Sequence, residues 1–188
     1  MVKIKKYIKD KYGLNFSSWI ICGVRGHDFI NGNLVPNSDE IDFYNDTLFI
    51  LKDKDFKVYR CTMDPGLHWI MKPMSVLGAA RIEEGLYTYQ RGKHKGHDAF
   101  TQASKVTVRR DKNKDKQWTE EQTSGFFGIN IHPRFTVSNR VGINSAGCTV
   151  IDSLPDQKDW KDFQSTLYAS VQKIYPYVVM NKETYEAL

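Results

Sequence analysis

Short apolar runs separated by turn residues fill most of the chain. The run at 16–24 is nearly continuous, as in a buried strand, and the runs at 46–51 and 56–63 flank a charged turn. Further apolar segments occur at 78–81, 85–91, 106–110, 126–131, 150–151 and 177–180. Short strands with turn signals between them are typical of sandwiches and barrels. The pattern therefore predicts a mainly β fold of the β-sandwich or barrel-like kind, with the last strand at an edge.

Two segments have helical periodicity instead. Residues 2–12 place Ile4, Tyr7 and Ile8 on one face and lysines on the other, which predicts a short N-terminal helix. Residues 156–175 form the strongest amphipathic pattern, with apolar residues at steps of three and four: Trp160, Phe163, Leu167, Val171 and Ile174. We expect a long helix there that packs on the sheet. The polar segment 25–45 is expected to be a long surface loop.

Length and composition are those of one folded domain spanning residues 1–188. The net charge of +5 suits an anionic partner, either nucleic acid or the carboxylates of a bacterial cell wall. Aromatic residues alternate with aliphatic ones and are not interleaved with Lys and Arg, which argues against nucleic acid.

The first residues are positively charged but are followed by no long hydrophobic stretch. Residues 16–24 are too few to span a bilayer, so we expect no membrane span and no signal peptide. Three cysteines cannot form a complete set of disulfides, which indicates a reduced chain made in a cytoplasm. The number of chains in the assembly is left open.

His132 and Cys148 form a candidate nucleophile pair. An apolar run ends at His132, a loop of turn-forming residues follows, and Cys148 begins the next apolar run. We expect the loop to bring the two side chains within about 3 to 4 Å. A free thiol has a pKa of about 8.5, so only a few per cent is thiolate at pH 7 unless a base assists. His132 is the candidate base and Cys148 the candidate nucleophile.

The residues just before the cysteine fit the same chemistry. Gly147 has no Cβ and lets a substrate carbonyl approach, and the amides of Gly147 and Cys148 are candidate oxyanion donors. Ser145 is expected to position this loop. The alternative is a buried structural cysteine beside a histidine that only ends a strand. Because Cys22 and Cys61 lie in apolar runs, we expect both to be buried and Cys148 to be partly open.

A histidine, a loop and then Ser145-Ala146-Gly147-Cys148 resembles the signature of the L,D-transpeptidase (YkuD-like) enzymes of bacterial cell walls. The resemblance covers residues 125–151 and extends to small phage-encoded proteins of that group. It implies a β-sandwich catalytic domain, with Cys148 as nucleophile, His132 as base, and Ser145 and Gly147 in the catalytic loop. Two positions depart from the family pattern: Ala146 replaces a second histidine, and no arginine or asparagine follows the cysteine.

The resemblance implies cysteine-dependent acyl transfer or hydrolysis on peptidoglycan stem peptides. Arg134, Arg140 and Asn144 lie between base and nucleophile and are the candidate substrate-binding residues. Without a signal peptide, such an enzyme is expected to reach the wall after lysis, in a virion or by delivery, as a phage endolysin does. Two alternatives remain: an inactive relative with a virion, structural or adaptor role, and a nucleic-acid-binding module.

Two polar segments resemble metal sites, but each lacks part of the required pattern. Residues 111–122 begin like a calcium loop, but Lys116 takes the place of the glycine and Gln122 that of the bidentate glutamate. Residues 92–98 contain His94, His97 and Asp98 without a second metal motif, and are expected to form a loop beside the cleft. We therefore expect no metal and no cofactor.

Overall fold

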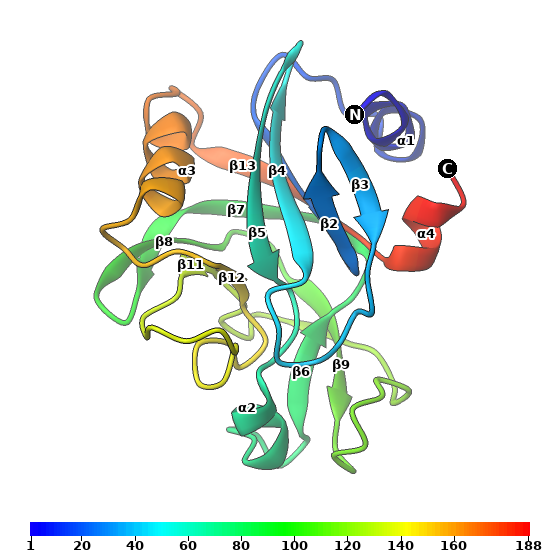
Figure 1. The fold of residues 1–188 in the computed structure, drawn as a ribbon, viewed down its shortest axis with the longest axis vertical. Coiled ribbons are helices and arrows are strands. Elements are labelled where there is room, and N and C mark those ends of the chain that lie inside the picture. The colour runs from blue at the N-terminus through cyan, green and yellow to red at the C-terminus, as the bar shows by residue number, and fades with distance from the viewer.

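The computed structural model describes residues 1–188, and a closed barrel of eight strands forms its centre (Figure 1). In order around the barrel the strands are β1 (Ile20–Val24), β13 (Ile174–Met180), β7 (Gly85–His94), β8 (His97–Gln102), β11 (Ile131–Pro133), β12 (Thr149–Ile151), β5 (Asp55–Thr62) and β4 (Asp46–Lys52). The pairs β1–β13 and β11–β12 are parallel, and the other pairs are antiparallel. Closure leaves no strand of the barrel with an unpaired edge.

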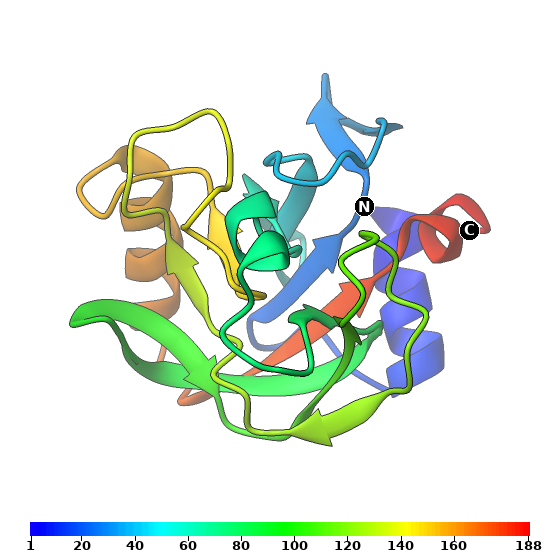
Figure 2. The same cartoon turned by 90° about the horizontal axis from the view of Figure 1, so that it is seen from below.

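Two smaller sheets and four helices surround the barrel. The sheets are β6 (Ala79–Ile82), β9 (Val106–Asp111) and β10 (Thr123–Gly125), and the hairpin β2 (His27–Ile30) with β3 (Asn33–Pro36). The helices are α1 (Val2–Tyr12), α2 (Leu67–Met71), α3 (Lys158–Tyr168) and α4 (Lys182–Glu186). Helix α3 covers one side, while α1 and α4 lie together on the opposite side (Figure 1, Figure 2). None of these helices has the length and apolar character needed to cross a membrane.

Strand β1 shows how alternation builds the core. Ile21 belongs to the main cluster inside the barrel, while Ile20 and Cys22 belong to a second cluster outside it. The outer cluster is covered by Ile4 and Ile8 of α1. Both faces of β1 are therefore buried, which explains its continuous apolar run. Each such aliphatic side chain contributes about 1.5–3 kcal/mol by leaving water.

The mainly β character and the N-terminal helix are confirmed, but the expected long C-terminal helix is wrong in extent. Helix α3 ends at Tyr168, and the next residues lead into β13. The guanidinium of Arg91 donates to the carbonyls of Leu167 and Tyr168, and the hydroxyl of Tyr175 also donates to the Leu167 carbonyl. These donors occupy the final carbonyls of the helix. The side chain of Val171 is fully exposed, so its helical spacing was coincidental.

Three smaller expectations also differ from the structure. The segment 25–45 is not loop throughout, because it contains the hairpin β2–β3. The run 126–131 is mostly without regular secondary structure, since β11 begins only at Ile131. The last strand, β13, is not at an edge: it lies between β1 and β7 and is longer than expected.

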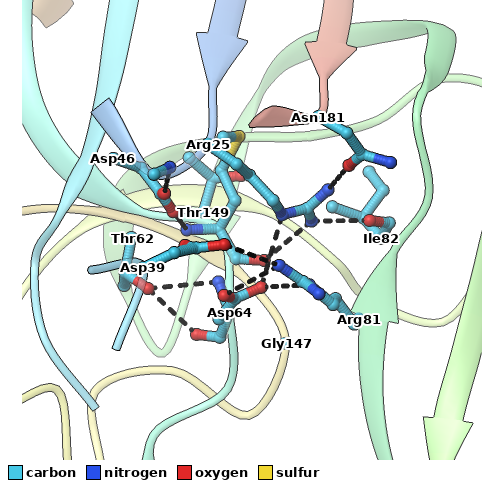
Figure 3. Close-up of polar contacts among 12 residues, drawn as sticks. Arg25, Asp39, Asp46, Thr62, Asp64, Arg81, Ile82, Gly147, Thr149 and Asn181 are labelled. Carbon is cyan, nitrogen blue, oxygen red and sulfur yellow. Dashed lines mark hydrogen bonds and ion pairs between the residues drawn. The ribbon is translucent and has the colours of Figure 1, made fainter. Parts of the chain in front are cut away.

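A cluster of buried charges joins the barrel to the three-stranded sheet of β6, β9 and β10 (Figure 3). Arg25, which is 2% exposed, donates to Asn181 at 2.7 Å and to the Ile82 carbonyl at 2.6 Å. Its Nε lies 3.4 Å from a carboxylate oxygen of Asp64, which also accepts from Arg81 Nε at 2.6 Å. The cluster therefore connects the ends of β1 and β13 to β6.

We expect Arg25→Leu to lower the free energy of unfolding by about 3–5 kcal/mol, because it removes one partner of a buried ion pair and leaves two buried acceptors unpaired. Urea denaturation measures this loss. Lys6→Ala is the matched control, since Lys6 pairs with Asp10 on the exposed face of α1 and such pairs contribute little. A loss below about 1 kcal/mol for Arg25→Leu would show that the cluster does not stabilise the fold.

Candidate active site

The parallel pair β11–β12 brings the predicted nucleophile and base together. His132 pairs with Val150 in this register, and Cys148 directly precedes β12. The amide of Thr149 donates to the Asn130 carbonyl at 2.9 Å, which extends the pairing next to the cysteine. Because the two strands run in the same direction, the loop between them returns the chain to the end where β11 began. The expectation of neighbouring strand ends is confirmed.

A third side chain, His94 at the end of β7, completes the cluster. One side-chain N or S atom from each of His94, His132 and Cys148 lies within 4.8 Å of the other two. The expected hydrogen-bond contact of about 3 to 4 Å between His132 and Cys148 is not formed, because the thiol donates to the Gly128 carbonyl at 3.5 Å and Nε2 of His132 has no partner. From the sequence, His94 is expected in a loop beside the cleft, or as a metal ligand, and is not assigned to the pair of base and nucleophile. The signal that the sequence offers is Gly96, which favours a two-residue hairpin turn after His94. In the structure Lys95 and Gly96 form that turn, and both have positive φ.

The ring of His132 is oriented as a base. Its Nδ1 lies 2.7 Å from the Pro133 carbonyl, which can only accept, so Nδ1 carries the proton. Its Nε2 is buried and has no hydrogen-bond partner, so the lone pair of this nitrogen is unoccupied. The His94 ring stacks on this imidazole with centroids 4.2 Å apart and planes 6° apart. Stacking and the Nδ1 bond together fix the ring.

Burial keeps both members of the pair neutral. Burial, followed by the adjacent His94, lowers the pKa of His132 to about 3. Burial raises the pKa of the Cys148 thiol to about 11, opposed by the Asn130 amide, which donates to the sulfur at 3.4 Å. At pH 7 the site therefore contains a thiol and a neutral imidazole. If Cys148 is a nucleophile, its thiolate has to form as the sulfur attacks.

Ser145 and Gly147 shape the loop that precedes the cysteine. The Ser145 hydroxyl donates to the Cys148 carbonyl at 2.8 Å and accepts from the Gly147 amide at 3.1 Å. Gly147 has φ of 131°, and a Cβ there would lie 2.5 Å from the Ala80 carbonyl oxygen. Because the Gly147 amide donates to Ser145, it is not free to be the oxyanion donor that the sequence predicts. The Cys148 amide has no acceptor within the chain and is available for that role.

The cluster opens into a cavity of about 310 Å³. His94, His132, Ala146 and Cys148 all line it. Cys148 is only 6% exposed, whereas Cys22 and Cys61 are fully buried, so the expected contrast in exposure is small. The half-buried and exposed side chains that line the cavity include four large apolar ones, which we call its mouth: Trp69 of α2, and Met74, Phe127 and Ile143 from loops.

The three predicted substrate-binding residues have other partners. Arg134 lies 3.2 Å from Asp152 and donates to the Ser138 carbonyl, and Arg140 lies over the Phe43 ring at 3.7 Å. Neither arginine lines the cavity. Asn144 does line it, but its amide accepts from two backbone N–H groups and donates to two oxygens. All three organise the loop between base and nucleophile.

Two histidines and a cysteine can also form a metal site, but the ring geometry disfavours it. A metal ion lies close to the plane of each imidazole that binds it, on the nitrogen lone pair. The rings of His94 and His132 are parallel and stacked, so no point lies in both planes within bonding distance. One ring would have to rotate out of the stack before both could ligate one ion.

No protein-family model, curated protein or solved structure matches the chain. The resemblance to L,D-transpeptidases therefore stays a prediction based on the residues from His132 to Cys148. The function is therefore inferred from the geometry and chemistry of the site together with this prediction.

The neutral pair predicts the pH dependence of thiol reactivity. Because the pKa of Cys148 is about 11, its alkylation by iodoacetamide should keep accelerating through pH 9 without an early plateau. Mass spectrometry of the modified peptide measures the rate, with Cys22 and Cys61 as internal references. A plateau below pH 8 would reveal a preformed thiolate–imidazolium pair and contradict this description.

The buried imidazole also predicts acid sensitivity. The unfolded chain takes up a proton at the ordinary histidine pKa of about 6.5, whereas folded His132 does so only near pH 3. Stability should therefore fall by a few kcal/mol as the pH drops through this range. His132→Asn retains a donor for the Pro133 carbonyl and should flatten the decline, as measured by urea unfolding between pH 7 and pH 4. An equal slope in both proteins would contradict the assigned shift.

Proposed function

We propose that the chain is a cysteine acyltransferase or hydrolase that acts on the stem peptides of bacterial peptidoglycan. The observation that carries the proposal is the buried Nε2 of His132, which has no partner in the chain and belongs to a ring that shares one compact cluster and one cavity with the Cys148 sulfur. An unsatisfied buried acceptor has a cost in stability. It is explained if the acceptor receives the thiol proton during a reaction.

The first step forms a thioester. The sulfur of Cys148 attacks a substrate carbonyl carbon while its proton passes to Nε2 of His132. The Cys148 amide donates to the oxygen that becomes negative. When the intermediate collapses, the carbon–nitrogen bond breaks and the imidazolium returns the proton to the leaving amine. The low pKa of His132 favours this return.

The second step releases the acyl group. Water or the amine of a second stem peptide loses a proton to Nε2 as it attacks the thioester, and the sulfur leaves. Water gives hydrolysis, whereas an amine gives transpeptidation. His94 acts as a positioning residue in both steps: its Nδ1 lies 3.0 Å from the side-chain amide nitrogen of Asn130, and its ring stacks on His132.

The choice of stem peptides rests on the resemblance of residues 125–151 to L,D-transpeptidases. The competing role is a structural cysteine in an inactive relative. Cys148 does pack with Tyr44, Val141 and Val150. However, a structural cysteine needs neither a cavity nor a fixed, unpartnered imidazole beside it.

The test is turnover of muropeptides by the purified protein. We expect a changed muropeptide profile by liquid chromatography and mass spectrometry, which Cys148→Ala abolishes. His132→Asn should lower the rate by about 10²- to 10⁴-fold, the contribution typical of a general base.

Cys22→Ala is the matched control, since Cys22 is buried in the outer cluster and does not line the cavity. It should retain the activity, and circular dichroism should show that all variants fold. Activity that survives in Cys148→Ala would contradict the proposal. So would an unchanged profile with peptidoglycan of every cross-link type.

A further inference from the structure

The charges that line the cavity are all of one sign. Lys95 and Arg110 belong to its wall, and no aspartate or glutamate does. Neither residue forms an ion pair within the chain, although eleven pairs occur elsewhere in it. Two unpaired cations beside an apolar cavity leave a positive potential that an anion can neutralise.

The turn of the β7–β8 hairpin places Lys95 in the wall of the cavity that His94, His132 and Cys148 also line. His94 pairs with His97, so Lys95 and Gly96 form a two-residue turn at the end of the hairpin. Lys95 has φ of 50°, a left-handed conformation that asparagine or glycine adopts more readily. Burial is the largest influence on the pKa of His94, His132 and Cys148, and the Lys95 ammonium lowers all three.

Arg110 reaches the cavity from the opposite sheet. It lies on β9 opposite Ala80 of β6, which also lines the cavity. One N–H donates to the Gly78 carbonyl at 3.1 Å, and the guanidinium lies 5.1 Å from the centre of the Phe127 ring. No other acceptor in the chain contacts it, so the remaining N–H groups are free for a bidentate acceptor.

From this arrangement we infer that Lys95 and Arg110 bind a free carboxylate of the substrate, next to the carbonyl that Cys148 attacks. The inference rests on the proposed function and specifies its substrate: a peptide end with a free carboxylate beside the scissile bond. The apolar side chains at the mouth cover the non-polar part of that peptide. An internal cross-link, which lacks the terminal carboxylate, is the poorer substrate.

A pair of alkylating reagents tests the anion site independently of any peptide. Iodoacetate and iodoacetamide differ only in a carboxylate or a carboxamide. Each reacts as the Cys148 sulfur bonds to carbon, iodide leaves, and the thiol proton passes to His132. We expect the ratio of the iodoacetate rate to the iodoacetamide rate at Cys148 to exceed that of the same cysteine in the urea-unfolded chain at least tenfold.

Substitutions at the hairpin locate the effect. Lys95→Asn removes the charge and suits the left-handed turn, so it should fold and should return the ratio towards the unfolded value. Lys95→Arg should keep the preference. Lys93→Asn is the matched control: Lys93 lies on the same hairpin, pairs with Asp98 and does not line the cavity. It should leave the ratio unchanged.

A second arm compares stem tetrapeptides that end in a carboxylate or a carboxamide. The acid should have a KM at least tenfold lower than the amide, and Lys95→Asn should remove that difference in KM. Equal ratios for the folded and unfolded chains, or an equal loss in Lys93→Asn, would overturn the inference. Turnover of both peptides with equal KM would overturn it too but leave the proposed function standing. Carboxylate-selective alkylation with no peptide turnover would support the anion site but contradict the proposed function.

Discussion

The parallel pairing of β11 with β12 is the constraint on which the barrel and the site both depend. Each strand has only three residues, yet this pair closes the ring between β8 and β5. The pair also sets the register that places His132 near Cys148. Successive side chains of a strand point to opposite faces. A slip of one residue would therefore turn His132 away from the sulfur and separate the pair.

Contacts on both sides of this pair fix its register. The hydroxyl of Thr149 lies 2.8 Å from that of Tyr177 inside the barrel. At the other end of β11, the Pro133 carbonyl accepts from His132, and the Arg134 amide donates to the Ile151 carbonyl. The site is thus assembled from backbone pairing as much as from side chains, which explains how a buried imidazole can be held without a carboxylate partner.

Much of the fold could be predicted from the sequence because its signals are local. The β4–β5 hairpin and the N-terminal helix follow from alternation and helical spacing, and both are present. The length of α3 could not be predicted, because the residue that occupies its last carbonyls, Arg91, is far away in the sequence. The closed barrel depends likewise on long-range pairs such as β1–β13, which periodicity alone does not specify.

In the candidate site, too, local features could be predicted from the sequence and long-range ones could not. His132 and Cys148 could be paired from their order and spacing, because one loop joins them. His94 and Arg110 come from other strands and Lys95 from a hairpin turn, and nothing in the local sequence connects them to the cysteine. Arg134 and Arg140 were nearer in sequence and chemically suitable, but Asp152 and Phe43 already engage them. Which cations face a cavity is decided by tertiary packing.

The loop that joins β11 to β12 has a consequence for how this scaffold can diversify. Its ends are fixed by strand pairing and by Asn144 and Ser145, whereas its tip, with Val137, is exposed. Lengthening a surface loop is inexpensive: each doubling costs only about 0.6 kcal/mol in closure entropy. Insertions at the tip can therefore build new walls around the cavity mouth while base and nucleophile keep their register. For the proposed enzyme, this means that substrate range and chemistry are encoded in separable parts of one short segment.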